Sequence, residues 1–237
     1  MCVRCCNRFE HRSPDNLEIN TIAMPFVLGA SVNCYLVRTS HGFVLIDTGR
    51  TNKRSKIEKE LVSKGCLPGN LQLIVLTHGD FDHCGNAGYL RKKFGTQVAM
   101  HKDDSGMVER GDMLWNRNKP NILIRIIFRL FFRLGKSDRF RPDLYVDEGF
   151  DFSEYAFDAK VLHIPGHSKG SIGILTTSGD LFCGDLLENA DKPESGSIVD
   201  DKVVAQASVE KLKRLQVNTV YPGHGQPFPM ELFLKTR

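Results

Sequence analysis

The chain has 237 residues, which is enough for one large domain with a sizeable core. Its hydrophobic fraction of 41% and charged fraction of 25% are those of ordinary globular proteins, which excludes a largely disordered chain. No uncharged apolar run reaches about 18 residues, so we expect no transmembrane helix, and segment 1–10 lacks the apolar stretch of a secretory signal.

The seven cysteines are odd in number and scattered along the chain, a pattern that does not indicate a disulfide framework. We therefore expect a reducing, cytoplasmic setting. Cys2, Cys5 and Cys6 lie close together, but no second ligand pair follows at the spacing of a zinc site. We interpret them as free thiols in a flexible segment, 1–17, that precedes a single domain, 18–237.

The formal net charge of +4 is unevenly distributed. Between Ser105 and Arg141 there are nine Lys and Arg against three Asp and Glu, which leaves 23 basic and 25 acidic residues elsewhere. A surplus confined to one segment does not indicate general affinity for nucleic acid, and we expect none.

The first half of the chain alternates strand-like and helix-like stretches. The expected elements, in chain order, are a hairpin of strands at 31–38 and 42–47, a helix at 51–64, a strand at 71–77, a helix at 86–94 and a strand at 96–100. The first helix is expected to bury Ile57, Leu61 and Val62. The run LQLIVLT predicts a strand that is covered on both faces.

The second half repeats this theme. The expected elements are strands at 159–164, 171–177, 181–183 and 218–221 and an amphipathic helix at 201–215. This helix is expected to bury Val204, Ala207, Leu212 and Leu215. The alternation predicts sheets with helices packed outside them.

Between the halves lies NILIRIIFRLFFRL (121–134), where Arg125, Arg129 and Arg133 form a cationic stripe at helical spacing. We expect a helix within a basic insertion, 105–150. Three roles stay open. The helix packs on the domain or on a second subunit of a homodimer, it forms a lid that offers apolar walls and a cation to an acidic or acyl substrate, or it lies on an anionic membrane surface, a role that we do not favour.

The segment THGDFDHCGN directly follows the buried strand and holds four candidate ligands, His78, Asp80, Asp82 and His83. Packing would not select them, because carboxylates are rarely buried unless they are paired or bound to metal. Imidazole suits transition metals, and carboxylate adds charge and harder oxygen ligands. The segment therefore predicts a metal site.

Three later segments that contain glycine also place a candidate ligand near the end of a predicted strand. They are IPGHSKGS with His167, FCGD with Asp185 and YPGHG with His224. Ligands at strand ends are typical of a site that is built on a rigid scaffold.

In order and local context these segments resemble the metallo-β-lactamase superfamily of hydrolases, including glyoxalase II and lactonase-like enzymes. The signature of that superfamily is similar to His-x-His-x-Asp-His followed by a distant His, Asp and His. The likeness runs from about Ser31 to Phe228 and includes NCYLV at Asn33–Val37 and VLIDTG at Val44–Gly49. It implies an α+β fold, a four-layer αβ/βα sandwich, with the site between the two sheets.

The resemblance also implies a role for each candidate residue. It implies a first metal on His78, Asp80 and His167, a second metal on Asp82, His83 and His224, and Asp185 as a bridge between the two. It further implies that Asp47 holds the ligand loop without binding metal.

Asp80 departs from the signature, which has histidine at this position. A carboxylate adds negative charge and favours harder ions, and related oxygen-reducing di-iron proteins place glutamate here. We therefore expect two divalent ions, with Zn as the first choice and Fe or Mn as alternatives.

The expected activity is that of a hydrolase with a small-molecule substrate. Two ions about 3.5–4 Å apart bridge a water and lower its pKa, and the resulting hydroxide attacks an ester, thioester, lactone or phosphodiester. Asp82 is the candidate catalytic residue that orients this nucleophile or takes its proton. The alternatives are a di-iron protein that reduces oxygen or nitric oxide with a separate flavin partner, and a non-catalytic binding module.

Overall fold

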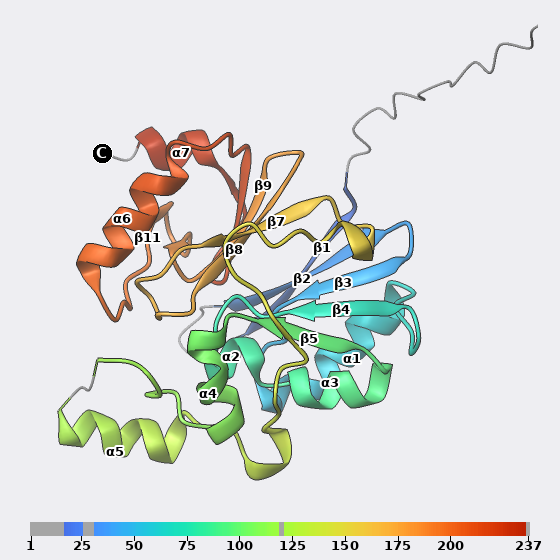
Figure 1. The fold of residues 1–237 in the computed structure, drawn as a ribbon, viewed down its shortest axis with the longest axis horizontal. Coiled ribbons are helices and arrows are strands. Elements are labelled where there is room, and N and C mark those ends of the chain that lie inside the picture. Colours follow the sequence, from blue (N-terminus) through green and yellow to red (C-terminus); the bar gives the residue numbers. More distant parts are fainter. Residues whose placement is uncertain (1–16, 26–30, 119–120, 236–237) are drawn as a thin grey trace, which may run out of the picture.

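The computed structural model describes residues 17–25, 31–118 and 121–235, and these form four layers in the order helices, sheet, sheet, helices (Figure 1). The expected α+β sandwich is confirmed. Segment 1–16, most of the N-terminal segment expected to be flexible, lies outside the described residues. Among those residues, no helix is both long and apolar enough to cross a membrane.

The first sheet has six strands in sequence order. They are β1 (Ile19–Pro25), β2 (Ser31–Thr39), β3 (Gly42–Ile46), β4 (Leu71–Val75), β5 (Gln97–Met100) and β6 (Leu144–Tyr145). Strands β1 to β3 pair antiparallel, which confirms the expected β2–β3 hairpin, and β3 to β6 pair parallel.

The second sheet has the order β13-β12-β9-β8-β7. Its strands are β7 (Ala159–His163), β8 (Ile172–Thr176), β9 (Asp180–Gly184), β12 (Thr219–Pro222) and β13 (Phe228–Pro229). Strands β9 and β12 run parallel, so their carboxyl ends meet at the same edge. A separate small hairpin pairs β10 (Leu187–Glu188) with β11 (Glu194–Ser195).

Helices cover the outer face of each sheet (Figure 1). They are α1 (Arg54–Ser63), α2 (Phe81–Cys84), α3 (Ala87–Phe94) and α4 (Lys102–Arg110) beside the first sheet, and α6 (Lys202–Leu212) and α7 (Met230–Lys235) beside the second. Short 3-10 turns occur at Thr51–Lys53, Lys136–Asp138 and Ser153–Tyr155. Helix α5 (Ile122–Phe131) stands apart from both sheets.

Three apolar clusters lie between these layers. Strand β4 contributes to two of them, because Leu73 and Val75 face the second sheet while Leu71 and Ile74 face α1 and α3. This burial on both faces explains the continuous apolar run of that strand. A third cluster packs the second sheet against α6 and α7.

Two expected helix faces are partly wrong. Helix α1 buries Ile57 and Leu61 as expected, but Val62 is exposed. Helix α6 begins at Lys202, after Asp201 accepts hydrogen bonds from the amides of Val203 and Val204. Packing against the second sheet buries Ala205, Ser208, Val209 and Leu212, so Leu212 is buried as expected, whereas Val204 and Ala207 face solvent.

The segment that leaves the sandwich is narrower than the expected insertion, 105–150. Helix α4 buries Met107 and Val108 in the core beneath the first sheet, and β6 extends that sheet. Helix α4 and strand β1 were not among the expected elements. Helix α4 is rich in charged residues and β1 mixes polar and apolar residues, so neither has a clear hydrophobic pattern.

Helix α5 exposes part of its apolar surface in the described chain. Five of its apolar side chains are 40–67% exposed, namely Ile122, Leu123, Ile126, Ile127 and Leu130. These five side chains do not pack on the described part of the domain, and the packing, lid, second-subunit and membrane roles of the helix all stay predictions.

Candidate metal centre

All seven candidate ligands meet where strands of the two sheets end. His78 follows β4, Asp185 directly follows β9, and His224 follows β12. His167 comes from the loop between β7 and β8. Asp80 is the residue before α2, and Asp82 and His83 lie within that short helix.

The nitrogen and oxygen atoms of these residues form two groups of three. The first ligand group is His78, Asp80 and His167, and the second ligand group is Asp82, His83 and His224. In each group the ligating atoms lie within 4.8 Å of one another. The seven side chains thus come together in the two sets that the sequence predicted, and the assignment of metal ions to them stays a prediction.

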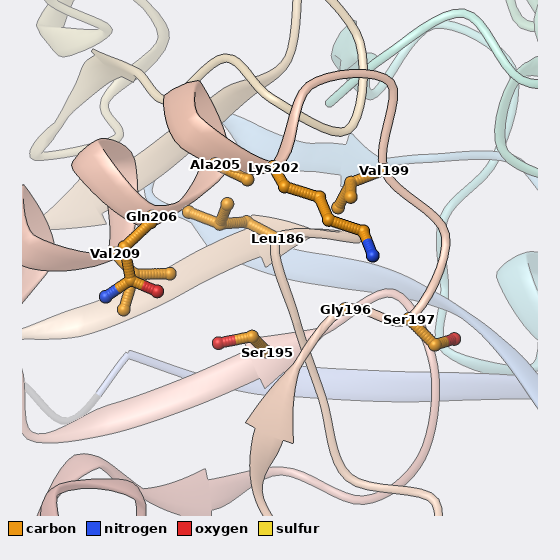
Figure 2. Close-up of a pocket in the computed structure, with 9 residues that line it drawn as sticks. All are labelled: Leu186, Ser195, Gly196, Ser197, Val199, Lys202, Ala205, Gln206 and Val209. Atoms are coloured by element: carbon orange, nitrogen blue, oxygen red, sulfur yellow. The ribbon is translucent and has the colours of Figure 1, made fainter.

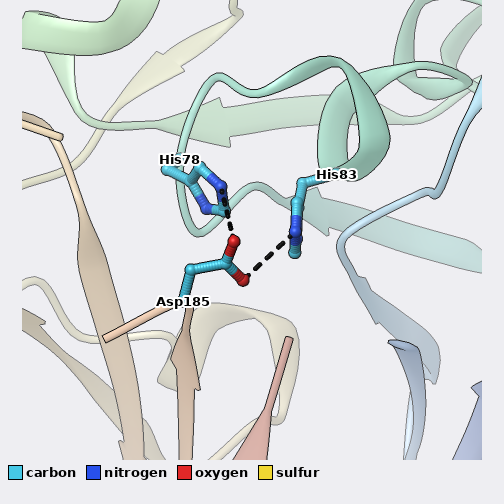
Figure 3. A group of neighbouring side chains, drawn as sticks. All are labelled: His78, His83 and Asp185. Carbon is cyan, nitrogen blue, oxygen red and sulfur yellow. Dashed lines mark ion pairs between the residues drawn. The ribbon is translucent and has the colours of Figure 1, made fainter. Parts of the chain in front are cut away.

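Asp185 lies between the two groups (Figure 3). Its Oδ2 is 3.7 Å from His78 Nε2 in the first group, and its Oδ1 is 3.2 Å from His83 Nε2 in the second. Its Oδ2 is also 3.4 Å from His224 Nε2. One carboxylate therefore faces both groups, as a bridging ligand must.

The spacing of the ligating atoms suits metal coordination. Two ligands on a tetrahedral ion with bonds of about 2.0–2.1 Å lie about 3.3 Å apart. His78 Nε2 is 3.6 Å from Asp80 Oδ2, and His224 Nε2 is 3.7 Å from Asp82 Oδ2. These separations are too long for hydrogen bonds and close to those of ligands that share an ion.

Each of the four histidines of the centre forms a hydrogen bond through Nδ1, the ring nitrogen that faces away from the centre. Thr77 Oγ1 accepts from His78 Nδ1, and Asp47 Oδ2 accepts from His83 Nδ1, each at 2.9 Å. The backbone carbonyls of Ile198 and Ser31 lie 2.6 and 2.9 Å from Nδ1 of His167 and His224. Because Nδ1 of each ring donates outward, Nε2 of each ring faces the centre, where it can bind a metal ion once it carries no proton.

Buried polar atoms in the centre support the same conclusion. Among the described residues, His78 Nε2, His83 Nε2, Asp80 Oδ1 and Asp185 Oδ1 are buried and have no hydrogen-bond partner. Buried polar groups are normally hydrogen-bonded or bound to an ion. The donor set and its geometry therefore fit a pair of metal ions.

Asp47 takes the supporting position that the resemblance implies. It follows β3 with a φ of 58° and accepts hydrogen bonds from the amide and the hydroxyl of Thr77. Its Oδ2 also holds His83. Asp47 thereby joins the strand before the ligand loop to a ring of the second ligand group.

Mutual attraction among these groups shifts their titration. Burial favours neutral His224, but the nearby Asp185 carboxylate outweighs burial and raises the pKa of His224 to about 9. Burial likewise opposes a charged Asp80, but Arg117 and His167 outweigh it and hold the pKa of Asp80 far below its ordinary range. Burial raises the pKa of Asp82.

Gly223 is required by the close approach of β12 to the centre. A Cβ atom at this position would lie 2.7 Å from His83 Cε1 and closer still to Asp185 Oδ1. The backbone between β12 and His224 therefore tolerates only glycine without displacing two candidate ligands.

Two charged residues that sequence reasoning missed support the centre. Buried Asp104 accepts hydrogen bonds from the amide of Gly79, the hydroxyl of Ser168 and the amide of Gly170. It therefore joins the two ligand loops, namely the 78–83 loop and the β7–β8 loop that carries His167. Arg117 Nη2 lies 3.0 Å from Asp80 Oδ2, and only 9% of the Arg117 side chain is exposed. No sequence signal pointed to Asp104, which precedes the basic segment, and the signal for Arg117 was only its charge within that segment.

A separate cavity of about 280 Å³ lies next to the centre (Figure 2). Its wall includes Leu186, which follows Asp185, and Ser197 and Val199, which flank Ile198. Helix α6 supplies the other side with Lys202 and Ala205. None of the seven candidate ligands lines it.

The end of α5 is tied to the ligand loop. The Phe132 ring packs against Phe81, with ring centroids 5.2 Å apart, and Phe81 lies between Asp80 and Asp82 in the motif. The C-terminal end of helix α5 therefore lies close to the ligand loop, whereas five of its apolar side chains are exposed.

Comparison with known proteins gives a family match over most of the chain. The model of the metallo-beta-lactamase superfamily matches residues 28–224. Hydroxyacylglutathione hydrolase GloC of Haemophilus influenzae is 32% identical over 120 residues, which cover 50% of each protein. Acyl-coenzyme A thioesterase MBLAC2 of Homo sapiens is 28% identical over 231 residues, which cover 86% of this chain and 76% of the enzyme.

Among solved structures, TTHA1623 in a di-iron-bound form is similar, with a TM-score of 0.71 and 27% identity. That match covers 92% of this chain and 98% of the other. The chain spans only about half the length of some curated relatives, 50% of GloC and 58% of a Beta-lactamase-like protein 2 homolog of Caenorhabditis elegans.

Proposed function

The chain belongs to the metallo-β-lactamase superfamily, and from this membership and the geometry of its centre we propose that it is a metal-dependent hydrolase. The observation that carries the proposal is the convergence of three separate strand ends on the 78–83 loop, with Asp185 facing both ligand groups. The fold of this superfamily implies a binuclear metal site, and the residues present fit one.

Each residue of the centre has a defined task in this proposal. His78, Asp80 and His167 would hold one ion, and Asp82, His83 and His224 would hold the other, while Asp185 would contact both. When bound, two divalent ions lower the pKa of water between them toward about 7 and polarise the bond to be cleaved. We propose Zn as the resident metal, with Fe or Mn as alternatives because of Asp80.

Asp82 would orient the nucleophile or accept its proton. The carboxyl lies in the second ligand group, with Oδ2 3.7 Å from His224 Nε2 and 3.9 Å from His83 Nε2. Burial raises its pKa above that of an ordinary aspartate, and a higher pKa makes a carboxylate a better proton acceptor.

Thioesters and esters are the substrate classes that we favour over lactones and phosphodiesters. Two of the relatives are named hydroxyacylglutathione hydrolase and acyl-coenzyme A thioesterase, and both names state the hydrolysis of an acyl thioester. The exposed apolar side chains of α5 and the contact of Phe132 with Phe81 in the ligand loop support a role for this helix in binding an acyl chain. We therefore propose the lid role for α5.

A reducing, cytoplasmic setting is also part of the proposal. Cys34, Cys66, Cys84 and Cys183 are all buried free thiols, and free thiols persist where glutathione keeps proteins reduced.

Removal and return of metal tests the hydrolase proposal. The chain, purified without added chelator, is assayed against short-chain and long-chain acyl thioesters, an ester, a lactone and a phosphodiester. Chelator dialysis is expected to abolish turnover of the best substrate, and added Zn²⁺ or Mn²⁺ is expected to restore it. Full activity in a protein that elemental analysis shows to be free of metal would rule the proposal out.

A di-iron redox protein is the second candidate, and the di-iron form of TTHA1623 together with Asp80 favours it. It would need a separate flavoprotein as electron donor. An iron-loaded protein that consumes oxygen with a reduced flavoprotein, and that hydrolyses none of the substrates above, would favour this candidate.

A further inference from the structure

Arg117 is a buried cation in contact with the metal centre. Its Nη2 lies 3.0 Å from Asp80 Oδ2, and the two side chains are only 9% and 14% exposed. A buried guanidinium is costly unless a carboxylate pairs with it, so the pairing with Asp80 is a built feature of the site.

The segment that carries Arg117 is fastened on two sides. The amide of Asn118 donates to Asp200 Oδ1 at 2.9 Å, and the Asn118 side chain donates to the Asp200 carbonyl. The side chain of Asn116 donates to the carbonyl of Asp103 at the start of α4. Residues 116–118 are therefore anchored to both halves of the chain, which holds the guanidinium against Asp80.

The two ligand groups differ in this respect. Asp80 Oδ2 receives both Arg117 and His167 Nε2, the latter at 2.9 Å. Among the described residues, the recorded ion pairs of Asp82 and Asp185 are all with histidines. Among these ion pairs, a fixed positive charge therefore touches Asp80 in the first ligand group, whereas Asp82 in the second ligand group pairs with histidines.

The charges of Asp80 and Arg117 cancel. The superfamily signature has a neutral histidine where this chain has Asp80, so the carboxylate adds one negative charge to the first group and the guanidinium removes it. Arg117 also occupies the carboxylate oxygen that lies nearest to His78 and His167. A cation that binds this oxygen must share it with the guanidinium. A cation that binds Asp80 Oδ1, which is buried without a hydrogen-bond partner, still lies close to a like charge that repels it.

We propose that Arg117 and Asp80 act as one unit that weakens the first ligand group for metal, so that the second ligand group binds its ion first and more tightly. This inference rests on the proposed metal site and adds a positioning residue, Arg117, that sets the difference between its two halves.

Metal titration of the full chain tests the inference without any measurement of turnover. The metal-free protein is titrated calorimetrically with Zn²⁺ and separately with Mn²⁺, and bound metal is counted after gel filtration. Wild type is expected to show one tight ion and one weaker ion. Arg117→Gln is expected to tighten the weaker site at least about tenfold, because a charge of the same sign as the ion is removed.

A pair of further variants separates charge from folding. Asp80→His leaves the guanidinium unpaired and is expected to lose the weaker ion. Asp80→His combined with Arg117→Gln resembles the superfamily signature and is expected to regain two ions. Arg110→Gln is the matched control, because Arg110 is an exposed arginine that stacks on Trp115, 4.1 Å from its ring centroid. Its metal affinities are expected to stay unchanged, and thermal unfolding of each variant checks that it folds.

Three outcomes would overturn the inference. In the first, Arg117→Gln leaves both affinities unchanged. In the second it weakens the first site, which would make Arg117 a support for a ligating Asp80. In the third, Asp80→His alone binds two ions as well as the double variant does. If affinity depends on Arg117 as expected but no substrate is hydrolysed, only the hydrolase proposal fails.

Discussion

Asp47 Oδ2 lies 2.9 Å from His83 Nδ1, and both side chains are buried. The same oxygen accepts a hydrogen bond from Thr77 Oγ1, which in turn accepts from His78 Nδ1. One carboxylate thereby fixes the protonated nitrogen of a ring in each ligand group, directly for His83 and through Thr77 for His78.

Asp47→Asn is the substitution that tests this relationship. Asparagine tolerates the positive φ of this position, but its amide group would face two donors, the hydroxyl of Thr77 and Nδ1–H of His83. We expect the affinity of the second ligand group for Zn²⁺ to fall by about 10–100-fold, measured by competition with a chromophoric chelator. Unchanged affinity would show that Asp47 serves folding alone.

Gly223→Ala is expected to disrupt the centre through its backbone. The added methyl group would overlap His83 and Asp185, and such overpacking costs about 1–3 kcal/mol. We expect a lower melting temperature and the loss of bound metal. Gly135→Ala is the control, since its nearest neighbours lie 3.4 and 3.9 Å from the new Cβ, and it is expected to keep both properties. Equal behaviour of the two variants would argue against the close approach.

Asp104→Ala should uncouple the two ligand loops. The change leaves the buried amides of Gly79 and Gly170 and the hydroxyl of Ser168 without their acceptor, and we expect a loss of about 2–4 kcal/mol in the free energy of unfolding. Chemical denaturation measures this loss. Asp103→Ala, at a neighbouring side chain that is 41% exposed, is expected to change stability by less than about 0.5 kcal/mol.

Metal binding should depend on pH through His224. Asp185 raises the pKa of this ring to about 9, so without metal His224 is protonated at neutral pH, and a metal ion must displace that proton. We expect affinity for Zn²⁺ to rise from pH 6.5 to about 9 and then to level off. Calorimetry in buffers of different ionisation enthalpy should show proton release at pH 7.5, and binding with no proton release would contradict the assignment.

The stability of the metal-free protein should follow the opposite trend. A histidine whose pKa is higher in the folded state than in the unfolded state stabilises the fold fully below its unfolded pKa of about 6.5. That contribution disappears as pH rises through about 9. The melting temperature of the chelator-treated protein is therefore expected to fall over this range.

Helix α5 offers a test of the lid role. Ile126 and Leu130 are 49% and 62% exposed, so Ile126→Ser with Leu130→Ser is expected to leave the melting temperature and metal content unchanged. For a long-chain acyl thioester we expect KM to rise while kcat stays within about twofold, because uniform binding is lost. Unchanged KM would refute the lid. Light scattering and co-sedimentation with anionic vesicles, compared between this variant and wild type, then test a subunit contact and a membrane contact.

The layers and the meeting of the seven side chains were predictable from the resemblance of the motifs to the metallo-β-lactamase superfamily. Strand ends alone would have brought Asp185 and His224 together after β9 and β12, but not His78, because β4 belongs to the other sheet. The hydrogen-bond acceptors for Nδ1 of His167 and His224 could not be predicted. They are the backbone carbonyls of Ile198 and Ser31, and a backbone carbonyl has no sequence signature.

A local sequence pattern also could not predict the burial of side chains that pack against residues far away in the chain. Nothing in the sequence distinguishes Arg117 from Arg125 or Arg133 in the basic segment, yet Arg117 is buried against Asp80. The buried face of α6 was only partly predicted, because packing of Ala205, Val209 and Leu212 against the second sheet decides it and periodicity alone does not.

Crystals of the chain grown with Zn²⁺, with anomalous diffraction collected at the zinc edge, measure the central claim most directly. The account predicts two anomalous peaks about 3.5–4 Å apart, one within bonding distance of each ligand group and both next to Asp185. Peaks only elsewhere on the molecule, with the histidine rings turned away from Asp185, would contradict it.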